Sequence, residues 1–281
     1  MTITEPHGGV ELTLTARAAG YAAIQHCLEL QSEIAPLSSF ERFFGASPLA
    51  MNARSWYLGA LGEILVAEKL ERLGPAWRVI NAVPVGSGGS DIDHVVVGPA
   101  GVFTLNTKAH ANKKVWAAGR ALRINGFQQD YVRNSQFEAA RASKLLTTAV
   151  GRPIEVTPLI VLVGVSEVSY GWRRPVVDVV TSRGIVRNLR RRRKILSTDA
   201  VAEIADVASR RGTWHRDAVV LDDTQRLVQR FERLRREVDA AARRRRARSV
   251  AGKLALLGAS VWICAELLNM VSVALAGGVL R

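Results

Sequence analysis

The stretch from Asp91 to Lys108 reads DIDHVVVGPAGVFTLNTK, in which two runs rich in β-branched and apolar residues flank the turn-forming tetrapeptide GPAG. This pattern predicts a β-hairpin. If the residues on either side of GPAG pair with each other, Asp93 lies opposite Asn106 and Asp91 lies opposite Lys108. Because side chains alternate along a strand with a period of two, all four polar groups then share one face of the hairpin. The hairpin therefore predicts a cluster of acid, amide and amine groups.

Helix and strand patterns alternate on both sides of this hairpin. We expect helices at residues 52–73 and 133–150, strands at residues 78–83, 92–97, 102–108, 122–124, 157–163 and 176–181, and a short strand around residue 115. The order of helix, meander, helix and strand predicts an α/β fold with a mixed sheet flanked by helices. Residues 12–44 also have a helical pattern, which closes near Gly45.

Glu63 is the only charged residue in an otherwise apolar helical segment, residues 56–67. Its neighbours on the helix surface are small and apolar. A carboxylate is almost never fully buried without a partner, so this position implies a cation or a metal ion nearby. The alternative is a glutamate that reaches an edge of the helix or pairs with a structural arginine.

A set of carboxylates, an amide and a lysine suits phosphodiester hydrolysis. Carboxylate and amide oxygens hold Mg²⁺, and a neighbouring lysine orients a water molecule or stabilises developing charge. The predicted metal ligands are Asp93, Asn106, Glu63 and Asp91, and the predicted catalytic residues are Lys108, Asp93 and Glu63. His94 points to the other face of the strand, where a packing or hydrogen-bonding role is expected instead.

The middle of the chain, residues 51–165, resembles a known family, the nuclease-related domain or NERD. The resemblance is carried by Gly59-Ala60-Leu61-Gly62-Glu63, by the segment from Gly89 to Phe103, by Asn106-Thr107-Lys108 and by Asn134-Ser135-Gln136. It implies a restriction-endonuclease-like fold and a Mg²⁺-dependent nuclease activity. We expect this activity to act on DNA, with RNA as an alternative. The resemblance also implies frequent fusion to other domains or to membrane segments. Many such enzymes carry Glu or Gln where Asn106 stands.

Asn106 keeps two functions open. An amide oxygen can bind Mg²⁺ but brings no negative charge, so metal affinity falls unless Glu63 or Asp91 compensates. The first function is a nuclease that hydrolyses the phosphodiester bonds of DNA. The alternative is a non-catalytic nucleic-acid-binding or signalling module that kept the nuclease fold. A structural protein of the inner membrane face, which would use only the C-terminal segments, is a third interpretation.

Charge and cysteine content limit the possible binding partners and the cellular compartment of the chain. The formal net charge is +14, and residues 183–248 alone hold 20 basic and 9 acidic residues. Such a surplus fits a nucleic-acid surface, an anionic membrane surface or a solvated face. The two cysteines, Cys27 and Cys264, are too few and too far apart for a disulfide framework or a zinc ribbon. The first thirty residues lack a secretory pattern, so we expect the N-terminal part to stay in the cytoplasm.

The last fifty residues show the sharpest change in composition. Arginines at positions 243–246 and 248 precede an apolar run from Leu254 to Leu280, which Glu266 and Asn269 interrupt. The run is long enough for a transmembrane helix, and the arginines predict that the rest of the chain lies at the cytoplasmic face of the cell membrane. A carboxylate inside the bilayer opposes this interpretation. The alternative is a packed or dimer-forming helix of a cytoplasmic protein.

These patterns divide the chain into four parts. We expect an N-terminal helical region at residues 1–50, a nuclease-related domain at 51–215 with its core at 51–165, a basic helix at 222–249, and a transmembrane helix at 254–280. Four apolar residues of the basic helix recur at coiled-coil spacing, namely Leu227, Phe231, Leu234 and Val238. They predict a homodimer seam over residues 227–238, with an amphipathic surface helix as the alternative.

Overall fold

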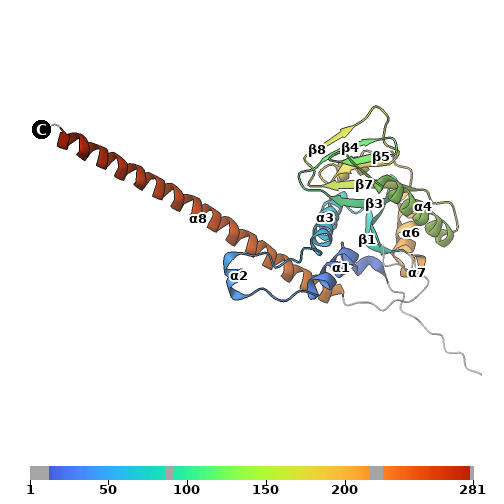
Figure 1. Cartoon of the computed structure of the whole chain (residues 1–281). Coiled ribbons are helices and arrows are strands. Elements are labelled where there is room, and N and C mark those ends of the chain that lie inside the picture. Colours follow the sequence, from blue (N-terminus) through green and yellow to red (C-terminus); the bar gives the residue numbers. More distant parts are fainter. Residues whose placement is uncertain (1–12, 86–90, 215–223, 279–281) are drawn as a thin grey trace, which may run out of the picture. The chain divides into compact units, whose positions relative to one another are not determined.

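The computed structural model describes residues 13–85, 91–214 and 224–278 (Figure 1). The chain divides into two compact units, one made of residues 1–30 and 52–229 and the other of residues 31–51 and 230–281. All the described strands belong to the first unit, and most of the long C-terminal helix belongs to the second.

Five strands form the main sheet of the first unit. They are β1 (Arg78–Pro84), β2 (Asp91–Gly98), β3 (Gly101–Ala109), β7 (Val156–Val163) and β9 (Asp178–Thr181), in the order β1-β2-β3-β7-β9. The first three pair antiparallel, whereas β7 is parallel to β3 and β9 is parallel to β7. Helices cover both faces, with α3 (Arg54–Leu70) on one and α4 (Tyr131–Val150) and α6 (Thr198–Ser209) on the other (Figure 1). The predicted α/β fold with a mixed sheet flanked by helices is confirmed.

A smaller second sheet follows β3 in the chain. Its strands are β6 (Phe127–Gln129), β5 (Ala121–Ile124), β4 (Lys114–Ala118) and β8 (Glu167–Tyr170), in that order. The inner face packs on β7, where Val115 and Leu122 share a core with Ile160 and Leu162. The remaining short elements of this unit are η1 (Leu14–Ala16), α1 (Tyr21–Ser32), η2 (Glu71–Leu73), α5 (Ile185–Arg190) and α7 (Arg211–Trp214).

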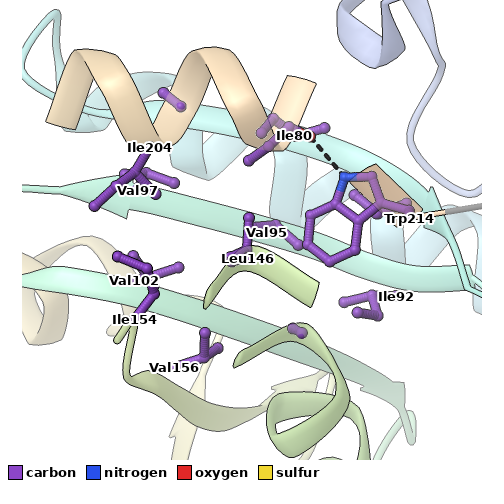
Figure 2. Packing of buried hydrophobic residues seen from close by; sticks show 14 of the residues in the cluster. Ile80, Ile92, Val95, Val97, Val102, Leu146, Ile154, Val156, Ile204 and Trp214 are labelled. Carbon is purple, nitrogen blue, oxygen red and sulfur yellow. Dashed lines mark hydrogen bonds between the residues drawn. The ribbon is translucent and has the colours of Figure 1, made fainter. Parts of the chain in front are cut away.

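The period of two along β2 explains why the main sheet has a core on each face. Val95 and Val97 pack on the side of α4 and α6, whereas Val96 packs on the side of α3. Figure 2 shows the first of these cores, which closes around Trp214. The indole nitrogen of Trp214 donates a hydrogen bond to the carbonyl oxygen of Ala208 at 2.7 Å, so the buried N–H is satisfied.

The GPAG turn is fixed by packing as well as by backbone geometry. Gly98 pairs with Gly101, whose φ of +120° favours glycine. The ring of Trp77 lies directly against Gly98, where an added Cβ would come within 2.1 Å of a ring carbon. A side chain at position 98 would displace Trp77, so this glycine helps to hold the hairpin in register.

The second unit consists mainly of α8 (Thr224–Gly278), a continuous helix of 55 residues. The predicted helices at 222–249 and 254–280 are therefore joined, and their expected ends at residues 222 and 280 lie outside the described residues. Part of α8 is long and apolar enough to cross a membrane. The same unit contains α2 (Ser39–Phe44), which ends at Gly45. The helical pattern expected over residues 12–44 is therefore not one helix, because the structure divides it into η1, α1 and α2.

Candidate active site

The predicted register of the β2–β3 hairpin is confirmed. Val97 pairs with Val102, and the ladder continues to His94 and Leu105. The predicted Asp93–Asn106 pair lies one step beyond this last backbone pair. There the carboxylate oxygen Oδ2 of Asp93 accepts a hydrogen bond from the backbone N–H of Thr107 at 2.5 Å. A carboxylate thus lies between the two strands where the ladder ends.

β2 changes its facing close to this point. Ile92, Val95 and Val97 all belong to the same core, although residues three apart face opposite sides in a regular strand. The neighbouring strand β1 is irregular at the same level, since Ala82 has a left-handed φ of +48° between the pairs on either side of Asp93. Because of this change, strict alternation no longer predicts the face on which the side chains before Asp93 lie.

Asp91 is accordingly held by an arginine. Its carboxylate oxygen Oδ2 accepts a hydrogen bond from Nη2 of Arg17 at 2.9 Å, and its side chain is largely buried. Burial raises the pKa of Asp91 to about 6, while the charge of Arg17 acts in the opposite direction. The hairpin register, combined with strict alternation of side chains, predicted that Asp91 faces Lys108. In the structure Asp91 instead forms an ion pair with Arg17.

α3 brings Glu63 to the hairpin by a close helix-to-strand contact. A Cβ added at Gly62 would lie 3.1 Å from the Cβ of Ala109 and 3.5 Å from Cγ2 of Thr107. Glu63 follows directly, and burial together with the negative charge of Asp93 raises the pKa of its carboxyl well above the usual value. The charge of Lys108 opposes that rise. We expected a cation near this buried carboxyl, and Lys108 supplies a positive charge that acts on it.

Glu138 on α4 is a member of the site that the sequence pattern did not single out. The side-chain nitrogen of Asn106 donates to both of its carboxylate oxygens, at 2.7 and 2.9 Å. Burial raises the pKa of Glu138 to about 7, and the hydrogen bond from Asn106 acts against this rise. One feature of the sequence could have pointed to Glu138: it lies directly before Ala139, which belongs to the buried stripe of α4. By contrast, Gln136 of the segment Asn134-Ser135-Gln136 is exposed.

Lys108 lies among these acids on the side of α4. Its Nζ is 5.2 Å from the ring centroid of Tyr131, and its charge acts on the carboxyls of Glu63, Asp93 and Glu138. The hydroxyl of Tyr131 is also 3.1 Å from Nε2 of His110. The structure thus brings Glu63, Asp93, Asn106 and Lys108 close to one another and adds Glu138. Asp91, whose charge also acts on Glu63, is paired with Arg17.

The oxygen set is suited to a hard divalent cation, although it is not a cluster of acids alone. Among the described residues, no group of three His, Cys, Asp or Glu side chains forms a ready metal site. The set is mixed, because the amide of Asn106 contributes a neutral oxygen, Oδ1, which is buried without a hydrogen-bond partner. Burial also raises the pKa of Asp93, although Lys108 and Thr107 act against it. A cation would satisfy the orphaned amide oxygen and the crowded carboxylates.

A comparison with protein families identifies the domain around this site. Residues 58–163 match the model of the nuclease-related domain, which runs from α3 to the end of β7 and includes Glu63, Asp93, Asn106, Lys108 and Glu138. This match to the nuclease-related domain covers somewhat more than a third of the chain. The resemblance seen in the sequence is thereby confirmed, and with it a nuclease-like fold. Comparisons with curated proteins and with solved structures gave no match.

Proposed function

We propose that this nuclease-related domain is a metal-dependent nuclease that hydrolyses phosphodiester bonds of DNA. The observation that carries the proposal is the convergence of Asp93, Asn106 and Glu63 on one end of the hairpin, with a buried amide oxygen that has no protein partner. These three residues would hold Mg²⁺, with Glu138 supplying further negative charge from α4. When bound, the metal ion would neutralise charge on the phosphate and acidify a water molecule.

The protein's own groups have separate tasks in this proposal. The backbone N–H of Thr107 holds the carboxylate of Asp93 in place through its oxygen Oδ2. Asn106 is oriented by Glu138, so that its Oδ1 is directed away from that carboxylate. Lys108 lies among negatively charged groups and can orient a water molecule or stabilise charge on a phosphate oxygen. Asp91 would act indirectly through Arg17, as support for the end of β2.

The second sheet supports contact with nucleic acid. Its outer face carries Trp116, with the guanidinium of Arg123 5.3 Å from the ring centroid, and the exposed Trp172 has Arg173 at 4.6 Å. Residues 113–129 and 167–174 hold six basic residues and one acidic residue, Glu167. Exposed aromatic rings beside positive charge suit base stacking and phosphate attraction. RNA remains the alternative substrate.

The membrane setting forms part of the same proposal. Described apolar side chains of α8 from Leu254 to Met270 are exposed, although a packed helix would bury them. The arginines at 243–246 and 248 would hold that end of α8 on the cytoplasmic side, so the domain would act at the cytoplasmic face. A homodimer through residues 227–238 stays a prediction.

Cleavage assays on the full chain in detergent test the proposal. Mg²⁺ titration should give cleavage of linear double-stranded and single-stranded DNA. Asp93→Ala and Lys108→Ala should each reduce cleavage by at least 100-fold, roughly what loss of a catalytic acid–base or electrostatic group costs. Glu203→Ala and Lys144→Ala are matched controls, because both residues are exposed and lie on α6 and α4.

The competing function is a module that binds nucleic acid without cutting it. The observation in its favour is Asn106, which replaces an acidic ligand by a neutral one. This module would bind DNA with the same affinity with and without Mg²⁺ and would not cleave it under any metal. Full cleavage by either Asp93→Ala or Lys108→Ala protein would overturn the active-site assignment.

A further inference from the structure

Three phenylalanine side chains of α2 are exposed. The exposed fractions of Phe40, Phe43 and Phe44 are 71%, 64% and 50%. Their rings form one cluster, with centroids 4.5 Å apart for Phe40 and Phe44 and 5.2 Å apart for Phe43 and Phe44. A contiguous patch of exposed aromatic rings on a protein surface usually marks a contact with a partner or a membrane.

α2 is a defined element with closed ends. Ser38 and Glu41 form a reciprocal capping box at its start, in which Oγ of Ser38 accepts from the backbone N–H of Glu41. The helix ends at Gly45, whose φ of +77° favours glycine. Both ends of this short helix, which carries the three rings, are therefore capped.

This element packs against the basic segment of α8, within the second unit. The guanidinium of Arg248 lies 4.1 Å from the ring centroid of Phe43 and 5.1 Å from that of Phe44. Nη1 of Arg244 donates to the carbonyl oxygen of Arg42 at 3.2 Å. A Cβ added at Gly45 would lie 3.0 Å from backbone atoms of α8, so the chain approaches the helix closely there.

The position of the cluster along α8 is informative. Arg248 precedes Leu254, the start of the apolar run, by six residues, which corresponds to about 9 Å along a helix. If the apolar run spans the bilayer, Arg248 lies at the level of the lipid headgroups. The phenylalanines that contact Arg248 then lie at the same level.

We propose that α2 is a second membrane contact, which inserts Phe40, Phe43 and Phe44 into the boundary between headgroups and acyl chains of an anionic bilayer. The proposal rests on the membrane span proposed for α8. A bilayer fits this surface because aromatic rings and arginines lie side by side, which matches the apolar and anionic layers of such an interface. The chain would thus hold the membrane by two elements, which restricts rotation of α8 about its axis.

Site-specific fluorescence on the full chain in lipid nanodiscs tests this inference. Cys264 is replaced by Ser and Cys27 is fully buried, so Phe40→Cys provides one reactive position for an environment-sensitive dye. The discs contain phosphatidylcholine and phosphatidylglycerol. We expect the dye at position 40 to emit at a shorter wavelength than the free dye does in water. Nitroxides placed on the upper acyl chain should quench this emission. Phe137→Cys on α4, with a side chain 68% exposed, is the matched control and should stay unquenched.

The outcomes separate this inference from the proposed span. Protein that co-purifies with the discs while the dye at position 40 behaves like the dye at position 137 overturns the anchor and leaves the span intact. Protein that does not enter the discs overturns both. A third measurement uses anionic lipid content: quenching at position 40 should fall when phosphatidylglycerol is omitted, because the arginines beside α2 then lose their attraction.

Discussion

The side-chain nitrogen of Asn106 donates to both carboxylate oxygens of Glu138, at 2.7 and 2.9 Å, and the carbonyl oxygen of the same amide is left without a hydrogen-bond partner. The strand therefore supplies a neutral oxygen, and the helix behind it supplies the negative charge.

Exchange of charge between positions 106 and 138 should be tolerated better than either single change. Asn106→Glu places a second buried carboxylate against Glu138, so the metal-free protein should lose about 2 to 4 kcal/mol of stability. Glu138→Gln removes the helix charge and should weaken Mg²⁺ binding. The double variant should restore stability and much of the affinity. Thermal unfolding and calorimetry with Mg²⁺ give both quantities, and an unchanged affinity in Glu138→Gln would remove Glu138 from the metal environment.

Close packing of α3 on β3 should be needed for the position of Glu63. Gly62→Val places methyl groups where Ala109 and Thr107 already lie, so the free energy of unfolding should fall by about 1 to 3 kcal/mol. The cleavage rate of the protein that remains folded should also fall, because Glu63 is displaced. Gly59→Val is the matched control, because that glycine lies on the same helix with no atom within 4 Å of an added Cβ. Equal loss of activity in both variants would mean that helix propensity, rather than the α3–β3 contact, matters.

Buried His94 should make the fold sensitive to acid. Its Nδ1 lies 2.9 Å from Oδ1 of Asn81, and burial lowers its pKa to about 3. The folded ring stays neutral between about pH 6.5 and 3, whereas the unfolded chain takes up a proton there, so stability falls as pH falls, by about 1.4 kcal/mol per unit.

His94→Gln is the variant that isolates this effect. Glutamine can still donate to Asn81 but does not titrate, so its unfolding free energy should decline less between pH 6.5 and 4.5. Other acids with raised pKa values, such as Asp91 and Glu138, are present in both proteins and cancel in the comparison. Parallel denaturant midpoints over that range in the two proteins would contradict the prediction.

Trp116 should contribute to the binding of single-stranded nucleic acid. Loss of one stacked base costs about 1 to 3 kcal/mol, so Trp116→Ala should weaken binding of a labelled oligonucleotide by roughly 5-fold to 150-fold. Fluorescence anisotropy in the presence of EDTA measures binding without cleavage. Trp56→Ala is the control, since the exposed fractions of the two side chains are 42% for Trp56 and 36% for Trp116. Equal affinities of the two variants would exclude the second sheet as a nucleic-acid surface.

The apolar part of α8 should tether the protein to membranes. Full-length protein should sediment with membranes and resist carbonate extraction, because its described apolar side chains beyond Leu254 have no cover in the chain. A chain that ends at Ser249 should be soluble. Full-length protein that stays in the soluble fraction would show that this helix is packed in a protein assembly instead.

The sequence by itself determined the features that depend on local periodicity. The GPAG turn and the period of two fixed the β2–β3 register, which the structure reproduces from Gly98 to His94. The helical period around Glu63 identified a buried carboxyl on α3, and the length of the apolar run identified a candidate membrane span. In each case the information lies within a few neighbouring turns or strands, where spacing alone decides which side chains share a face.

Only the tertiary structure decided which partners the polar groups take. Arg17 and Asp91 are 74 residues apart in the chain, Asn106 and Glu138 are 32 apart, and Arg42 and Arg244 are 202 apart. No periodicity links such positions, because they meet only after helices have packed on sheets or on one another. The change of facing in β2 beside Ala82 also escapes a rule of strict alternation. Asp91 was therefore assigned to the hairpin face from its spacing, while packing against the N-terminal segment directs it to Arg17.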